Sequence, residues 1–251
     1  MKAKKVILII FTALAALYLL FIFTLVNFPF EPLLARIDGN LRESHGTGLD
    51  AGSVRYRYPL SLHLRDVRIE RDEMVLTADE LFIKIRLLNF GRRRTVELSA
   101  ENIGARSALA DASGIRMNAA AGLHLFRMMR GSVPSVEYVR VVLSGGEIER
   151  VLLAGFELSS MTLDTLQLFL EGDEKGFEVQ RGILKADVAR VELDGRADPD
   201  GLDLKMAVVL TDLFYRKFGE LKTIVDSAFE DGKLTLEIKG TIDKPQTRIV
   251  K

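Results

Sequence analysis

The sequence predicts a mainly β protein in which an N-terminal transmembrane helix precedes a curled antiparallel β-meander with one or two short helices. An uninterrupted apolar segment near the start, alternation of period two through most of the remainder, and turn residues between the alternating runs support this fold class. At 48% hydrophobic and 28% charged residues, the 251-residue chain is too apolar to be disordered. We divide it into an anchor at 1–30, a connecting helix at 31–48 and a β-rich domain at 49–251.

Residues 6–30 contain no Asp, Glu, Lys or Arg. A helix over this segment would be roughly 37 Å long, which exceeds the ~30 Å hydrocarbon core of a bilayer. Pro29 and Pro32 mark its expected end. A cleaved signal peptide is the alternative, but the apolar run continues well past the small residues around Ala13, and a secretory apolar region is shorter. We therefore expect an uncleaved, single-pass anchor.

Lys2, Lys4 and Lys5 precede the apolar segment. Basic flanks stay on the cytoplasmic side, so the N-terminus is expected in the cytoplasm and the bulk of the chain across the membrane, which is the periplasm in a Gram-negative cell. Beyond these three lysines, 32 basic residues face 35 acidic ones. A nucleic-acid partner is disfavoured because phosphate neutralisation requires a basic excess.

The connecting segment at 31–48 has helical periodicity. Its apolar residues recur at spacings of three and four, and glycines follow them: Leu33, Leu34, Ile37, Leu41, Gly46 and Gly48. We expect a short amphipathic helix that packs on the domain or on lipid headgroups.

From Gly52 onward, apolar and polar residues alternate, as in strands with one buried face. After the alternating runs of 54–70 and 81–87, further runs cover residues 95–100, 136–143, 163–170, 177–186, 188–193, 202–210 and 233–238. Lys244 and Pro245 precede an expected final edge strand. Helices are predicted at 123–130 and at 212–230, the second between Asp212 and Gly232 and placed to cover one end of the sheet.

An antiparallel meander has one apolar and one solvated face. Leu81, Ile83, Ile85 and Leu87 are the candidate lining of an apolar groove. If a second layer of structure covered this face, it would be an ordinary core. Only two helices are predicted, which is too few to cover the sheet, so an open groove for acyl chains is favoured. The basic cluster that follows is expected in a solvated hairpin loop, and contact with lipid headgroups or an acidic partner is its candidate function: Arg92, Arg93 and Arg94.

Motifs for catalysis are missing from the sequence. It has no Cys, and His45, His63 and His124 lack metal-ligand spacing. It also lacks a phosphate-binding Gly-rich loop and a Gly-x-Ser-x-Gly nucleophile motif. We therefore expect no enzyme activity, metal or cofactor. An envelope hydrolase is a third hypothesis that rests only on unassigned carboxylates.

Several segments carry a family resemblance: residues 28–32 and the helix after them, then 58–62 and 64–69, and the strand–glycine–strand–proline pattern of 234–245. In this order they resemble the bacterial type II secretion system protein N family, also called general secretion pathway protein N, which is itself similar to AsmA-like proteins. The specific motifs cover 28–70 and 233–248, whereas 90–230 is similar only as a generic meander.

The resemblance implies a bacterial inner-membrane protein with a curled, strand-rich periplasmic domain, in the form of an AsmA-like open groove or half-barrel. Our first functional hypothesis is a non-enzymatic accessory of type II protein secretion that acts by contact with other inner-membrane secretion proteins. The alternative is an AsmA-like envelope protein that binds or transfers phospholipid in the apolar groove. The resemblance implies no catalytic residue for either function.

Overall fold

The computed structural model describes residues 20, 24, 28, 30–57, 61–86, 93–108, 110–124, 135–153, 156–173, 176–198, 201–223, 225, 232–241 and 244–250. Most of the predicted anchor at 6–30 lies outside these residues, as do Lys2, Lys4 and Lys5. Within the described part of the chain, no helix combines the length and the apolar character needed to cross a membrane.

The described residues form a mainly β protein, as predicted, with thirteen strands in one antiparallel sheet. Helix α2 (Phe30–His45) precedes the sheet, and helix α3 (Asp212–Lys217) with the 3-10 turn η2 (Gly219–Leu221) lies between the eleventh and twelfth strands. The strands are β1 (Thr47–Arg57), β2 (Ser61–Arg71), β3 (Met74–Arg86), β4 (Arg93–Arg106), β5 (Ala110–His124), β6 (Ser135–Ser144), β7 (Glu147–Leu153), β8 (Phe156–Gly172), β9 (Phe177–Ala186), β10 (Ala189–Asp198), β11 (Gly201–Leu210), β12 (Lys233–Thr241) and β13 (Lys244–Val250).

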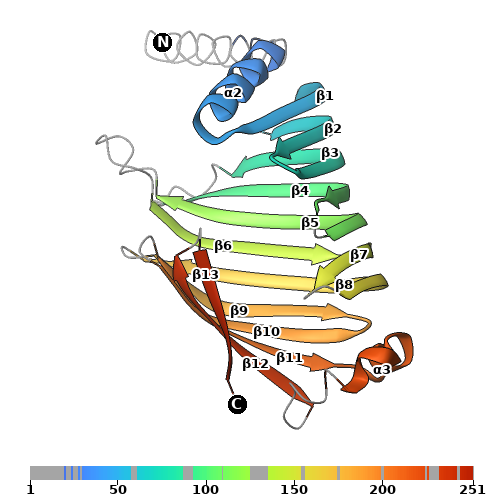
Figure 1. The fold of residues 1–251 in the computed structure, drawn as a ribbon. Helices are drawn as coiled ribbons and strands as arrows, with labels where there is room; N and C mark the ends of the chain where they lie inside the picture. The colour runs from blue at the N-terminus through green and yellow to red at the C-terminus, as the bar shows by residue number, and fades with distance from the viewer. Residues whose placement is uncertain are drawn as a thin grey trace, which may run out of the picture.

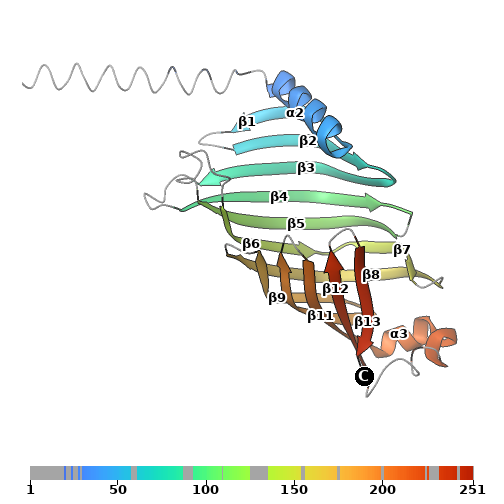
Figure 2. The ribbon, with the colours of Figure 1, turned by 60° about the vertical axis from the view of Figure 1, so that its left-hand side comes forward.

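The topology is a meander in which neighbours in the chain are neighbours in the sheet. β6 and β7 together fill one strand position, because both lie between β5 and β8. The sheet is strongly twisted, so that β13 runs steeply across the direction of β8 (Figures 1 and 2). As predicted, the last strand lies at an edge, since β13 pairs only with β12 among the described strands.

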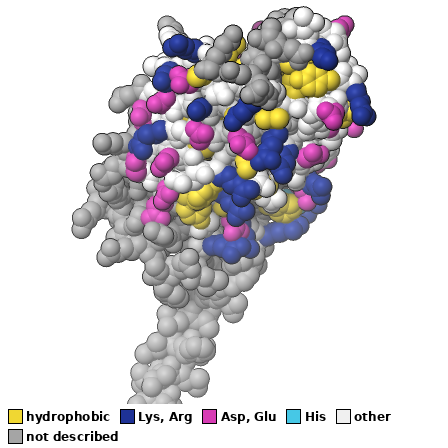
Figure 3. All heavy atoms as spheres, turned by 90° about the horizontal axis from the view of Figure 1, so that it is seen from below, with side chains coloured by type: hydrophobic (Ala, Val, Ile, Leu, Met, Phe, Trp, Pro, Cys, Tyr) yellow, Lys and Arg dark blue, Asp and Glu magenta, His cyan; other side chains and the backbone are white. Residues whose placement is uncertain are grey.

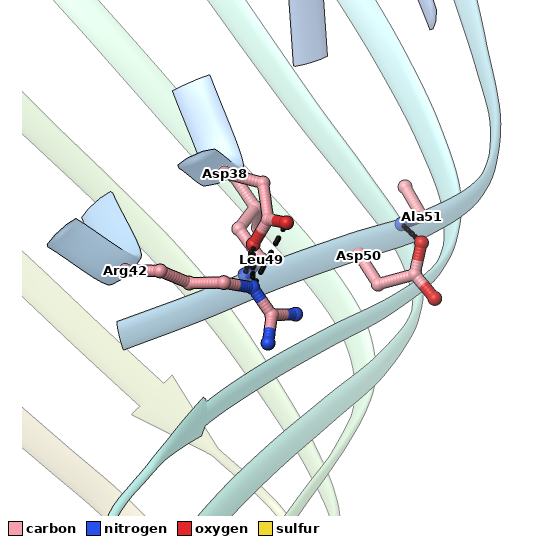
Figure 4. A network of polar contacts seen from close by, with 5 residues as sticks. All are labelled: Asp38, Arg42, Leu49, Asp50 and Ala51. Carbon is pink, nitrogen blue, oxygen red and sulfur yellow. Dashed lines mark hydrogen bonds and ion pairs between the residues drawn. The ribbon is translucent and has the colours of Figure 1, made fainter. Parts of the chain in front are cut away.

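Helix α2 lies against β1 and is fastened to it by one carboxylate (Figure 4). Asp38 Oδ1 accepts hydrogen bonds from the Leu49 backbone N–H at 2.7 Å and from Arg42 Nε at 2.8 Å. The Leu49 N–H, and then Arg42, lower the pKa of Asp38 below its usual value. Because β1 is the first strand of the sheet, α2 covers an edge that would otherwise be free to pair with another chain.

Helix α3 covers one end of the sheet. Its Phe214 and the following Phe218 pack against Leu158, Met161 and Val188, which are all buried. The predicted helix of 212–230 is therefore α3 and η2 over its described first half, whereas residues 226–230 lie outside the described residues.

A polar contact next to this cluster holds α3 in place. Asp187 accepts hydrogen bonds from Lys217 Nζ at 2.7 Å and from the Thr162 N–H at 3.0 Å. Burial alone would raise the pKa of Asp187, but the hydrogen bonds from Lys217 and from the backbone outweigh burial and lower it.

The predicted helix at 123–130 is wrong where the structure describes it. Leu123 and His124 belong to β5, where they pair with β4 on one side and β6 on the other, and 125–130 lie outside the described residues. β5 itself was not predicted as a strand. Its centre, Ala119–Ala120–Ala121, carries no polar–apolar contrast from which a period could be recognised.

Candidate functional site

One face of the sheet carries continuous rows of apolar side chains. Partners directly opposite one another on adjacent strands point to the same face, so the strand registers define these rows. The first row crosses eleven strands: Val54, Leu64, Leu81, Ala100, Met117, Leu143, Leu166, Leu184, Val191, Val208 and Leu234. We call this side of the sheet the apolar face.

Two more rows run parallel to the first. The second is Tyr56, Leu62, Ile83, Leu98, Ala119, Val141, Leu168, Gly182, Leu193, Met206, Leu236 and Ile249. The third is Ile85, Val96, Ala121, Val139, Leu170, Val179, Gly195, Leu204 and Ile238. At about 4.8 Å per strand, the first row is about 50 Å long. None of the three contains a charged residue.

One-residue irregularities in several strands keep further apolar residues on the same face. Alternation changes from a step of two to a step of three, and four of these steps contain a residue with positive φ: Asp66 (51°), Asn102 (53°), Gly114 (72°) and Ser160 (56°). Leu158 and Met161, which flank Ser160, pack in one cluster, so both ends of that step point the same way. Asn102 Nδ2 donates a hydrogen bond to Asp79 Oδ2 at 2.7 Å, which joins neighbouring strands at this level.

The apolar face is only partly covered. Eleven hydrophobic side chains are buried among the described residues, and five of them form the cluster with α3. Most members of the three rows are half-buried, and Ile85 and Ile249 expose 41% and 48% of their surface. The described part of the chain supplies no second layer over the middle of the rows.

The candidate groove residues lie on this face. Leu81, Ile83 and Ile85 project from β3 into the first, second and third rows, respectively. Leu87 and Arg92 lie outside the described residues. The backbones of Arg93 and Arg94 begin β4 and pair with those of His124 and Leu123, but the structure does not describe their side chains.

Aromatic residues connect the rows to the N-terminal helix. The ring of Phe30, the first residue of α2, stacks on Tyr56 with 6.3 Å between centroids and 10° between planes. Phe28 contacts Phe30 edge-on at 5.0 Å. Because Tyr56 begins the second row, the apolar face starts beside the end of the predicted membrane anchor.

The opposite, polar face carries charged residues in equivalent rows. One row reads Arg57, Ser61, Lys84, Glu97, Ala120, Arg140, Phe169 and Arg181. Seen from below, the molecule presents basic side chains that gather near the middle of the view beside hydrophobic patches (Figure 3).

Metal and acid–base chemistry find little support in the described residues. They contain no group of three or more His, Asp or Glu residues arranged to hold a metal ion. His63 is buried at 2% exposure, stacks on Phe82 and has Nε2 3.4 Å from a Glu80 carboxylate oxygen. This histidine acts as part of the packing of β2 against β3.

No protein-family model matches the chain, and neither a curated protein nor a solved structure matches it. The function is therefore inferred from the two faces of the sheet and from their residues.

Proposed function

We propose that the protein is a non-enzymatic envelope protein that binds phospholipid acyl chains along its apolar face. The observation that carries this proposal is the set of uncharged rows, the first of which crosses eleven strands without a polar side chain. Acyl chains require no hydrogen-bond partner, and each buried CH2 group contributes about 0.8 kcal/mol. This function requires that the curved sheet form an open groove of the AsmA-like kind, which is part of the proposal.

Acyl chains suit this face better than an additional folded layer of the same chain would. The rows lie half-buried in the described structure, and large exposed apolar surfaces mark interaction sites. Their start beside Phe30 and Tyr56 supports an entry close to the predicted end of the membrane anchor. A lipid leaving the membrane would meet the first rows at β1.

The test compares neighbouring residues on opposite faces of β8. Leu168 belongs to the second apolar row, and Gln167 points to the polar face. We expect Leu168→Glu in the full-length protein to lose most of the phospholipid that survives detergent exchange, measured by native mass spectrometry, whereas Gln167→Glu retains it. Equal lipid content in both variants and the unchanged protein would contradict acyl-chain binding at this face.

A second proposed function is that of an accessory of type II protein secretion, which the family resemblance supports. The favouring observation is on α2, where Leu33 and Ile37 expose 45% and 42% of their surface. An apolar stripe beside a membrane anchor suits contact with another inner-membrane protein.

This second function is tested by a photo-reactive residue at Leu33 in cells that contain the secretion system, with Glu43 as the control position on α2. We expect an adduct with an inner-membrane secretion protein from Leu33. Adducts with lipid alone would rule out the secretion contact and leave the lipid proposal standing.

A further inference from the structure

We propose that a hollow on the polar face, above β5, is a binding site for a phosphate-bearing organic anion. Its volume is about 640 Å³, within the range of small-molecule sites. The side chains that define it come from β1 to β6 and include Arg57, Phe82, Lys84, Asn118, Ala120 and Arg140. It lies on the face opposite the proposed acyl-chain rows and goes beyond the proposed function.

The hollow exists because β5 carries small residues between longer neighbours. Ala120 lies opposite Glu97 on β4 and Arg140 on β6, so a short side chain separates two long ones. At Gly122, an added Cβ would be only 2.3 Å from the Tyr138 ring. The ring lies across the glycine, and its hydroxyl is 3.3 Å from Thr95 Oγ1, so the next position along β5 on this face is covered by an aromatic ring.

The charge of the hollow favours an anion. Arg57, Lys84 and Arg140 line it, and none of them forms an ion pair with a carboxylate in the described part of the chain. The one carboxylate in the lining belongs to Glu97, which is neutralised by Arg86 Nε at 2.7 Å. A concave surface with unpaired cations concentrates anions.

The cations are accompanied by groups that suit an organic phosphate. The Arg57 guanidinium lies 5.6 Å from the centroid of the Phe82 ring, and that ring stacks on buried His63 at 4.2 Å, so Arg57 is partly positioned before a ligand arrives. Arg and Lys donate charge-assisted hydrogen bonds to phosphate oxygens, and hydroxyl and amide donors add to them. The donors are Ser61, Ser99 and Asn118, and Phe82 and Val142 offer apolar contact to the organic part of the ligand.

The experiment is calorimetric titration of the full-length protein in detergent with two probes, glycerol 3-phosphate and dihexanoyl phosphatidic acid. We expect binding that weakens as salt is added. Arg140→Gln should weaken it about ten- to hundredfold, since a hydrogen bond between charged groups is lost. Ala120→Leu fills the hollow without changing any charge and should weaken binding similarly. Lys185→Gln removes an exposed cation of the same face outside the lining and should leave binding unchanged.

The two probes distinguish the source of the phosphate. Binding of glycerol 3-phosphate supports a soluble ligand, and binding of phosphatidic acid alone supports a lipid headgroup. No binding of either probe at millimolar concentration, or an equal loss in Lys185→Gln, would overturn the site. If Ala120→Leu fails to fold, Arg140→Gln still tests the site, because Arg140 is exposed and its substitution should not disturb folding. Leu168→Glu should leave phosphate binding intact, which separates failure here from failure of the acyl-chain proposal.

Discussion

Two parts of the apolar face contain the same kinds of side chain but differ in what covers them. At one end, α3 buries Phe214 to 5% exposure and Phe218 to 9%, together with Leu158, Met161 and Val188. Across the middle of the sheet, the three rows are half-buried, and Ile85 is 41% exposed. The covered end is a core that stabilises the fold. The uncovered rows contribute less to stability and leave apolar surface for a ligand. Whether a second layer covers the apolar face therefore decides whether its side chains stabilise the fold or are available for binding.

The sharpest test of this comparison removes one large side chain from each part. Phe214→Ala should lower the free energy of unfolding by about 3–5 kcal/mol, because it leaves a cavity in a closed cluster. Leu168→Ala in the uncovered rows should cost less than about 2 kcal/mol, because a half-buried side chain loses less contact with its surroundings. Denaturant unfolding of both variants measures the difference. Equal costs would show that the rows are core and that something covers them.

The next largest effect concerns the irregular positions that keep apolar residues on one face. Asn102 has φ 53°, a conformation that a β-branched residue strongly disfavours. Asn102→Val should therefore cost about 1–3 kcal/mol, whereas Asn102→Gly should cost less despite losing the hydrogen bond to Asp79. If the valine and glycine variants unfolded at the same denaturant concentration, the positive φ of residue 102 would not be needed for the three-residue spacing from Ala100 to Ile103.

A smaller effect is expected from the polar contact that holds α3 on the covered end. The pKa of Asp187 is lowered in the folded state, so its contribution is complete at neutral pH and is lost as pH falls from the ordinary value of 3.8 through the lowered one. The pair with Lys217 is worth up to about 1 kcal/mol. Lys217→Met should remove this part of the pH dependence, measured by thermal unfolding between neutral pH and the acid limit. An unchanged profile would place the acid sensitivity elsewhere.

The smallest effect should come from the fastening of α2 to β1. Asp38→Asn weakens the acceptor for the part-buried Leu49 N–H and removes the ion pair with Arg42, whose side chain is 58% exposed. We expect faster hydrogen exchange at Leu49 with no change in the global unfolding temperature. Loss of cooperative unfolding in this variant would mean that α2 belongs to the core and is more than an edge cover.

Alternation in the sequence was enough to predict a mainly β meander with one apolar face. Leu81, Ile83 and Ile85 were chosen from that alternation alone, and they occupy the three rows. The steps of three, such as Leu64 to Val67 and Ala100 to Ile103, are also visible in the sequence and could have located the irregular positions.

Other features depend on long-range register and could not be predicted. β5 is rich in Ala and Gly, so its strand character comes from pairing with β4 and β6 and not from its own pattern. The hollow on the polar face brings together Lys84 of β3, Ala120 of β5 and Arg140 of β6, which depends on the register of each strand with its neighbour. The alternation within a single strand does not show which residues of other strands lie beside it.

The central claim is that the uncovered rows hold acyl chains, and the most direct test places a photo-reactive residue on either side of one strand. Leu193 of β10 belongs to the second row, whereas Glu192 points to the polar face and is exposed. After illumination of the full-length protein in membranes, mass spectrometry should find phospholipid adducts at Leu193 and few or none at Glu192. Adducts in equal amount at both positions, or at neither, would contradict the claim.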